Sequence, residues 1–242
     1  MKKIKDAYGQ EVWFAFNKKD SYEVIEREDG FVGLSGGAKN YFAEFKNWPK
    51  WQKKAIKFAK GRVLDVGCGA GRIGLYLQKK GLDVISIDNS PLAIKVCKKR
   101  GLKKAMVMPI EKINKFKPNS FDTIIMFGVN FGLFGNFKKA KKLLKTLYKI
   151  TSPNALIIAE SNDPYKTNDP VHLSYHKLNK KRGRMAGQIR MRIRFKNYIS
   201  NWFDYLLVSK KEMKDILNGT GWKVKKFIDS GNYMYIGIIT KV

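Results

Sequence analysis

The sequence predicts an α/β protein whose core is a doubly wound, mostly parallel sheet. Short apolar runs alternate along the chain with segments whose apolar residues recur at helical spacing. The first run, Val63–Val66, opens directly into a loop with glycine at every second position, at Gly67, Gly69 and Gly71. The second run ends at Asp88, about twenty residues after those glycines. An apolar strand, a glycine loop and a helix in this order begin a nucleotide-binding unit of α/β proteins.

The glycine loop is the segment around which we expect the chain to be organised. Without a side chain, the backbone can approach a ligand closely and can adopt positive φ angles. The free N–H groups at the start of the following helix can face an anionic group. The spacing is not the dinucleotide pattern G-x-G-x-x-G, because Gly71 comes one residue early and Arg72 stands where that pattern has glycine. A loop that only joins a strand to a helix is the alternative.

Composition and charge limit the classes of function. The hydrophobic fraction of 44% is ordinary for a globular chain with a core. The formal net charge is +29, from 49 lysines and arginines against 20 acidic residues. A field of this sign favours polyanions such as RNA. Lysines on the solvated outer faces of helices explain the same charge, so the total does not decide between the two.

The sequence carries no signal for a membrane, a secretory route or a metal. No apolar run approaches the roughly 18 residues of a membrane span. The basic start, Met1–Asp6, is not followed by the apolar core of a signal peptide. Cys68 and Cys97 lack the spacing of metal ligands. We therefore expect a cytoplasmic protein with reduced cysteines that binds neither a membrane nor a metal.

Two stretches carry a resemblance to a known family. Asp65–Gly71 has the pattern D-x-G-x-G-x-G and resembles motif I of the class I S-adenosylmethionine-dependent methyltransferases. The sequence NSFDTIIM at Asn119–Met126 resembles the entry to the fourth strand in methyltransferases of the type 11 kind. The resemblance covers about residues 60–160 and 209–242. It implies a Rossmann-like sheet that is mostly parallel with an antiparallel last strand.

The resemblance implies S-adenosyl-L-methionine as the cofactor. Asp65 and the glycine backbone would hold its methionine part. Asp88 lies where an acid can accept hydrogen bonds from both ribose hydroxyls, although a strand end or a helix N-cap is the alternative. Ile110 and Glu111 follow the third strand and would flank the adenine, unless Glu111 is only an exposed acid. The expected cofactor-site residues are Asp65, Gly67, Cys68, Gly69, Gly71, Asp88, Asn89, Ile110, Glu111 and Phe127.

We expect a single domain over residues 1–242 with parts of different character. Residues 1–60 are an aromatic N-terminal cap and a lead-in helix, and the cap could also move as a lid over the cofactor. Residues 61–160 are the cofactor-binding core. Residues 161–208 are an insertion on the substrate side, and residues 209–242 form a closing helix and a pair of strands.

The insertion contains a predicted basic β-ribbon. In Ile189–Phe195 apolar and basic residues alternate strictly, which predicts a strand with one face buried and one face of arginines. Trp202–Val208 could pair with it. A row of like charges indicates an anionic neighbour, either a substrate such as RNA or an acidic small molecule, or the acidic segment Glu23–Asp29 of the same chain. The arginines expected on the substrate side are Arg190, Arg192 and Arg194.

No catalytic base is identifiable from the sequence. Asn130 and Phe131 lie in a glycine- and aromatic-rich loop after the fourth strand, where open α/β sheets bring substrate and cofactor together. His172 and His176 could share a helix face and act as a base, although histidines that only add polar surface explain them as well. The candidates for catalysis are therefore Asn130, His172 and His176.

Three functions remain open. The first, slightly favoured, is an S-adenosylmethionine-dependent methyltransferase acting on RNA through the arginine strand. The second is a methyltransferase acting on a small anionic molecule enclosed by the cap and the insertion. The third is a nucleic-acid-binding protein that keeps a vestigial cofactor fold, against which the intact acidic residues and glycines argue. The methyl acceptor and the oligomeric state do not follow from the sequence.

Overall fold

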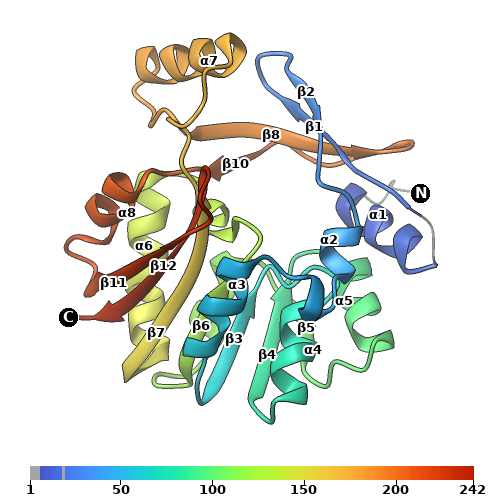
Figure 1. Cartoon of the computed structure of the whole chain (residues 1–242), viewed down its shortest axis with the longest axis vertical. Coiled ribbons are helices and arrows are strands. Elements are labelled where there is room, and N and C mark those ends of the chain that lie inside the picture. The colour runs from blue at the N-terminus through green and yellow to red at the C-terminus, as the bar shows by residue number, and fades with distance from the viewer. Residues whose placement is uncertain (1–5, 18–19) are drawn as a thin grey trace.

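Two β-sheets lie one above the other in the computed structural model, which describes residues 6–17 and 20–242 (Figure 1). The lower sheet is the large central sheet and the upper one is smaller. The expectation that the basic start is not a signal peptide falls largely on residues 1–5, outside the described residues.

The central sheet has the predicted topology. Its seven strands lie in the order β11-β12-β7-β6-β3-β4-β5. The five strands from β7 to β5 are mutually parallel. The last strand, β12, runs antiparallel between β7 and β11, which confirms the expected antiparallel insertion. The strands span β3 Arg62–Val66, β4 Asp83–Asp88, β5 Ala105–Val107, β6 Phe121–Met126, β7 Thr151–Asn162, β11 Trp222–Asp229 and β12 Met234–Lys241.

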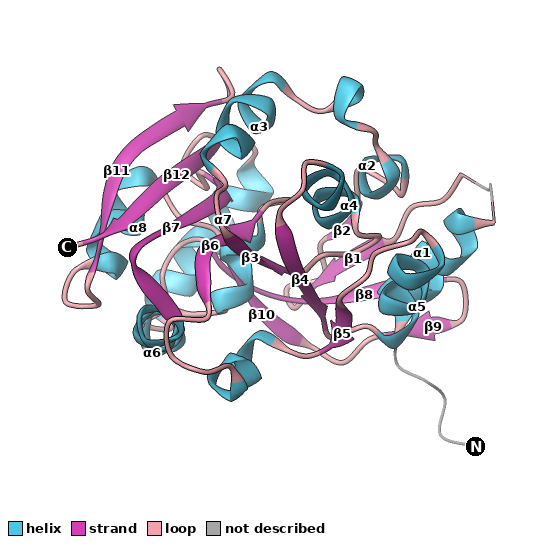
Figure 2. Ribbon diagram, turned by 90° about the horizontal axis from the view of Figure 1, so that it is seen from below, coloured by secondary structure: helices cyan, strands magenta, loops and turns pink. Residues whose placement is uncertain are grey.

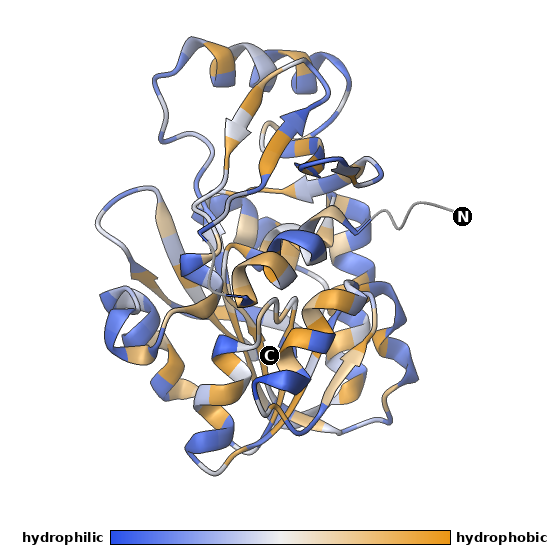
Figure 3. Ribbon diagram, turned by 90° about the vertical axis from the view of Figure 1, so that its right-hand side faces the viewer, coloured by the Kyte–Doolittle hydropathy of each residue, from blue (hydrophilic) through white to orange (hydrophobic). Residues whose placement is uncertain are grey.

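Helices cover both faces of the central sheet, so its strands are apolar on both sides. Ile124 of β6 packs with α6, α8 and η3, whereas the next residue, Ile125, packs with α3 and α4 on the other face. Figures 2 and 3 show these layers and the apolar stretches along the strands. The helical segments are α3 Lys50–Ala55, η2 Ile56–Phe58, α4 Arg72–Lys79, α5 Pro91–Lys99, η3 Ile110–Lys115, η4 Asn130–Phe134, α6 Phe137–Ile150 and α8 Lys210–Leu217.

The sequence predicted an N-terminal cap and a basic β-ribbon as separate parts. In the structure both contribute strands to the smaller sheet, which we call the cap sheet. Strands β8 and β10 pair as expected. However, β1 pairs antiparallel with the other side of β8, with Ile25 opposite Ile193. The N-terminal region and the insertion therefore build one sheet together. Its strands are β1 Val24–Arg27, β2 Val32–Leu34, β8 Gln188–Phe195, β9 Tyr198–Ile199 and β10 Phe203–Leu206.

The N-terminal helices join the cap sheet to the cofactor-binding core. Helix α1, Ala7–Phe16, packs its Val12 against Ala93 and Val96 of α5. Asp6 caps α1 through Gly9 N–H at 2.8 Å, and its second oxygen accepts a hydrogen bond from Ser90 Oγ at 2.8 Å. The short helices α2, Lys39–Phe42, and η1, Phe45–Asn47, lead from the cap sheet to α3. Helix α7, Pro170–Lys181, lies on the far side of the cap sheet from the central sheet (Figure 1).

Candidate functional site

The glycine loop adopts a conformation that only glycine tolerates at these positions. Gly67 and Gly69 have φ angles of 69° and 53°. A Cβ on Gly67 would lie 2.5 Å from Asn130 Nδ2, and one on Gly69 would lie 2.5 Å from the hydroxyl of Tyr8. A side chain at either position would be strained and would also clash. The loop is thus a backbone cradle, which is the feature that a nucleoside cofactor with a charged tail requires.

The side chain of Asn130 supports the glycine loop through two hydrogen bonds. Its Nδ2 donates to the carbonyl oxygens of Val66 and Gly67 at 3.0 and 2.9 Å. The residue expected on the substrate side therefore contacts the cofactor loop. Phe131, its neighbour, is wholly buried against Phe134 in the core. Because it is buried in the core, we do not place Phe131 on the acceptor side.

Asp88 braces the loop from the end of β4. Its two carboxylate oxygens accept hydrogen bonds from the N–H groups of Gly69 and Ser90, both at 2.9 Å. Burial raises the pKa of Asp88 to about 6, although these two backbone donors oppose the rise. Each carboxylate oxygen keeps a further lone pair. The side chain therefore has the acceptors that two ribose hydroxyls would need, at the position where we expect the ribose.

Asp65 lies under the loop within β3. Its carboxylate is buried and accepts a hydrogen bond from Ser86 Oγ at 3.3 Å. Burial raises its pKa to about 7. Cys68 and Cys97 bring their sulfur atoms to 3.8 Å of each other, and Cys97 Sγ donates to the carbonyl of Gly69 at 3.1 Å. The loop is therefore tied to β4 and α5 by several contacts.

The remaining expected cofactor residues differ in exposure. Asn89 is exposed beside Asp88. Ile110 is buried at the start of η3. Glu111 is exposed and forms an ion pair with Lys139 of α6 at 2.5 Å. Phe127 is buried on the α3 and α4 side of the central sheet. Contact of these four residues with the cofactor stays a prediction.

A buried network around Glu160 escaped the sequence analysis. Glu160 lies near the carboxyl end of β7 and is fully buried. Its carboxylate accepts hydrogen bonds from Trp51 Nε1 at 2.8 Å, from Gln52 Nε2 at 2.8 Å and from the N–H of Gly128 at 2.6 Å. Arg72 donates to Gln52 Oε1 at 2.9 Å. In the sequence, Glu160 ends an apolar run as Asp88 does, and this position was the signal that could have identified it as a site residue.

The aromatic N-terminal segment lies over the glycine loop. Tyr8 and Tyr41 meet edge to face with ring centroids 5.4 Å apart. Tyr41 Oη donates to Glu23 at 2.5 Å, and Glu11 lies buried beside them. From the cap sheet, Tyr205 donates to the carbonyl of Val129, next to the end of β6, at 2.8 Å. Tyrosines thus lie against the glycine loop, with carboxyl groups behind them.

The arginines of β8 are paired within the chain. Glu26 of β1 accepts hydrogen bonds from Arg192 at 2.9 and 2.7 Å and also from Arg194. These hydrogen bonds, first from Arg192 and then from Arg194, hold the pKa of Glu26 well below its usual range. Arg190 pairs with Asp204 of β10 at 3.1 Å. Of the two neighbours that the arginine row indicated, the acidic segment of the same chain is the one that the structure contains.

The two histidines lie away from the glycine loop. Both belong to α7, on the far side of the cap sheet (Figure 1). His172 Nδ1 lies 3.0 Å from a guanidinium nitrogen of Arg27, and His176 packs near Tyr165. The structure therefore does not bring His172 or His176 to the cofactor cradle, and a catalytic role for either stays a prediction.

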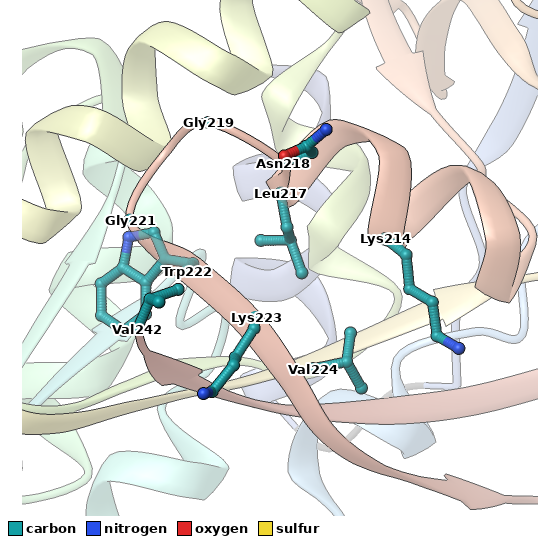
Figure 4. A pocket seen from close by; sticks show the side chains of 9 residues that line it. All are labelled: Lys214, Leu217, Asn218, Gly219, Gly221, Trp222, Lys223, Val224 and Val242. Carbon is teal, nitrogen blue, oxygen red and sulfur yellow. The ribbon is translucent and has the colours of Figure 1, made fainter.

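A pocket at the edge strand β11 lies away from the glycine loop. Figure 4 shows it between α8 and β11, with Leu217, Trp222 and Val224 among its lining residues. It does not include the glycine loop or Asp88.

Within residues 6–17 and 20–242, no helix is long and apolar enough to cross a membrane. In the same part of the chain, no three metal-ligating side chains come together.

Comparisons with known proteins agree on the core of this site. Residues 64–159 match the family described as methyltransferase domain. A solved methyltransferase from Bacteroides fragilis, in complex with S-adenosyl-L-homocysteine, is 25% identical with a TM-score of 0.82. The match covers 98% of this chain and 95% of that one. The CcbJ methyltransferase from Streptomyces caelestis covers 99% of both chains at 10% identity and a TM-score of 0.64, which shows a shared fold.

Curated relatives match a shorter stretch. A tRNA (uracil(54)-C(5))-methyltransferase from Pyrococcus horikoshii is 29% identical over 126 residues, 51% of this chain and 29% of that protein. A demethylmenaquinone methyltransferase from Renibacterium salmoninarum is 31% identical over 121 residues, 49% of each chain. The chain thus spans about half the length of these relatives or less.

Proposed function

Because this chain is a class I S-adenosylmethionine-dependent methyltransferase, we propose that it methylates a small molecule held between the cap sheet and the central sheet. The observation that carries the proposal is the pairing of the β8 arginines with Glu26 and Asp204. An RNA-binding face needs arginines that are available to phosphates, and these three already have carboxylate partners. The cap sheet then serves to cover the site.

The residues of the cradle fit the cofactor. The open glycine backbone would receive the methionine part, and the free lone pairs of Asp88 would accept from the ribose. When bound, the cofactor supplies an electrophilic methyl group on a sulfonium. The chain must then hold the acceptor atom in line with the departing sulfur and exclude water. The tyrosines above the loop and the cap sheet support both tasks.

The curated relatives leave the acceptor class open. One acts on tRNA and another on demethylmenaquinone by their names, and both align over only about half of this chain. The family match over residues 64–159 contains the glycine loop and Asp88, whereas the acceptor side that we propose comes mainly from residues outside that range. The net charge of +29 still favours RNA as a second candidate, and the experiment below separates the two.

The test is transfer of a labelled methyl group into an extract of the source cells. Purified protein and methyl-labelled S-adenosylmethionine are incubated with extract that has been treated or not treated with RNase. We expect the label in the fraction below ~1 kDa, unchanged by RNase. Label in a high-molecular-weight fraction that RNase abolishes would refute the small-molecule proposal. Asp88→Ala, which removes the expected ribose contact, serves as the inactive control.

A salt titration gives an independent measurement. Binding of single-stranded RNA is followed while the salt concentration is raised. A protein that contacts phosphates binds at ~50 mM salt and loses affinity steeply as salt increases. We expect no binding beyond that of a similarly basic unrelated protein. Calorimetry with S-adenosylhomocysteine tests the cofactor assignment in the same preparation, and failure to bind it would remove the enzyme function altogether.

A further inference from the structure

Two buried carboxyl groups lie behind the tyrosines of the site. Glu11 of α1 is 0% exposed and Glu23, just before β1, is 3% exposed. Glu11 Oε1 accepts from Ser21 Oγ at 3.1 Å, and Glu23 Oε1 accepts from Tyr41 Oη at 2.5 Å. The second oxygen of each has no hydrogen-bond partner among the described residues. A buried carboxylate oxygen without a partner is costly, so this pair requires an explanation.

One proton held by the pair is part of that explanation. Burial, and then the neighbouring Glu23, raise the pKa of Glu11 to about 8. Two carboxylates in one buried site do not both ionise readily. At neutral pH Glu11 therefore keeps its proton. The second oxygen of Glu23 has no partner among the described residues, so it is open to a proton that arrives through the Tyr41 hydroxyl.

Tyr41 connects this pair to the cofactor cradle. Its Cδ1 atom lies 4.0 Å from the point where a Cβ of Gly69 would stand, and its hydroxyl is bonded to Glu23. Tyr8 faces the same point from α1, and its hydroxyl is 2.5 Å away from it. Burial, then Glu23, Glu11 and finally Tyr205 of β10 raise the pKa of Tyr41 well above its usual value. A proton could pass from the cradle to Glu23 through the Tyr41 hydroxyl.

Among residues 6–17 and 20–242, no cation bonds to the pair. Ser21 and Tyr41 donate hydrogen bonds to Glu11 and Glu23, and no lysine, arginine or histidine of this part of the chain does so. Two cations lie near the cradle, but both have other partners: Arg100 donates to the carbonyl of Ala70 at 2.5 Å, and Arg72 donates to Gln52 and stacks over Trp48 at 4.8 Å. Tyrosine faces beside a carboxylate attract cations. A cationic acceptor supplies a positive partner that the described residues do not give to Glu11 and Glu23.

We propose that Glu23, supported by Glu11, takes up the proton that the methyl acceptor loses, by way of the Tyr41 hydroxyl, and that the acceptor is the protonated amine of a small molecule. The inference rests on the proposed function and names the acceptor class for the same site. It replaces the anionic acceptor expected from the arginine row, because those arginines already pair with Glu26 and Asp204 within the cap sheet.

Methyl transfer to the amine begins with the loss of a proton from the ammonium group. An N–H bond of the ammonium group breaks, the proton goes to Tyr41 Oη, and the proton of Tyr41 goes to Glu23. The freed lone pair of the nitrogen forms a bond to the methyl carbon. The bond between that carbon and the sulfur breaks, and its electron pair stays on the sulfur. The products are an N-methylammonium ion and a neutral thioether, with the transferred proton on Glu23 in addition to the proton that Glu11 already holds.

Two matched probes test the charge preference. Tyramine and 3-(4-hydroxyphenyl)propionate share a phenol ring and differ in carrying an ammonium or a carboxylate group. Their affinities for the complex with S-adenosylhomocysteine are measured by ligand-observed NMR. We expect tyramine to bind at least tenfold more tightly than the propionate. Glu23→Gln and Tyr41→Phe should each weaken tyramine at least tenfold while leaving the affinity for S-adenosylhomocysteine within about twofold.

Matched controls use the exposed residues Glu44 and Tyr22. Glu44→Gln and Tyr22→Phe should bind tyramine like the wild type. A pH series adds a measurement that a purely structural role would not change. Tyramine affinity should rise between pH 7 and 9 in the wild type as the pair gains a second negative charge, and the rise should be absent in Glu11→Gln. Melting curves establish that each variant is folded, and Glu11→Gln stays informative if Glu23→Gln unfolds.

The outcomes separate this inference from the proposed function. Equal affinity for the two probes, or undiminished tyramine binding in both Glu23→Gln and Tyr41→Phe, overturns the inference while S-adenosylhomocysteine binding keeps the enzyme function. A large loss of S-adenosylhomocysteine affinity in Glu23→Gln overturns it as well, because the carboxylate would then serve the amino group of the cofactor. Absence of S-adenosylhomocysteine binding in the wild type defeats the proposed function itself.

Discussion

The substitution Glu11→Gln should change how the stability of the protein depends on pH. The folded-state pKa of Glu11 is about 8, against 4.5 for the same group in a solvated chain. Because the folded protein binds this proton more tightly than the unfolded chain, raising the pH through this window favours unfolding. Stability that is fully present below about pH 4.5 is lost progressively up to about pH 8. Glutamine has no proton to lose, so the variant avoids this loss.

The magnitude follows from the pKa difference. A shift from 4.5 to about 8 corresponds to at most about 5 kcal/mol, at about 1.4 kcal/mol per pKa unit. Relaxation around the ionised pair lowers this, and we expect about 2 to 5 kcal/mol. Asp65 and Asp88, with pKa values raised to about 7 and about 6, add a similar slope to both proteins. The difference between wild type and variant therefore isolates Glu11.

Urea unfolding followed by tryptophan fluorescence at pH 5, 7 and 9 measures this difference. At pH 5 the two proteins should have similar stability, because the glutamine amide can donate to Glu23 as the protonated acid does. At pH 9 the variant should be the more stable one. Glu44→Gln, a change at an exposed ion pair, should show no such pH-dependent gain. A stability difference that stays constant from pH 5 to pH 9 would refute the shared proton.

Three further changes test the cradle and the cap sheet. Gly71→Ala should lower the free energy of unfolding in urea by about 1 to 3 kcal/mol, because Gly71 has a φ of 80° and a Cβ would lie 2.9 Å from Cys97 Sγ; a stability equal to wild type would contradict the strain. Asn130→Ala should reduce S-adenosylhomocysteine affinity about tenfold by calorimetry, since the two loop carbonyls lose their donor; unchanged affinity would count against this support. Glu26→Gln should increase RNA binding at ~50 mM salt, because two arginines of β8 lose their carboxylate partner; no increase would show that other contacts hold them.

The cap sheet explains why an RNA-binding function looked reasonable from the sequence. The alternation in β8 was interpreted correctly as a strand with an arginine face. Its neighbour, however, is β1, whose Glu26 stands opposite Arg192 in the register. These residues lie 166 positions apart in the chain. Only the folded structure shows that the arginines of this row pair with acidic residues of the chain itself.

The sequence by itself determined the central sheet and the cofactor cradle. Both depend on neighbouring residues: strands buried on two faces are continuous apolar runs, and the cradle is a run of glycines between one strand and its helix, with Asp88 at the end of the next strand. Local spacing suffices to recognise such features.

The tertiary structure decided the surroundings of the acidic residues. The pairing of β1 with β8 and the Glu160 network join segments far apart in the chain, and the Glu11–Glu23 pair joins a residue of α1 to one just before β1. Each of these acids looks in the sequence like an ordinary surface or strand-end carboxylate. Its environment, and hence its charge and its chemistry, arises only when distant elements bury it. For this reason the sequence indicated what donates the methyl group, whereas the proposal for what receives it rests on the fold.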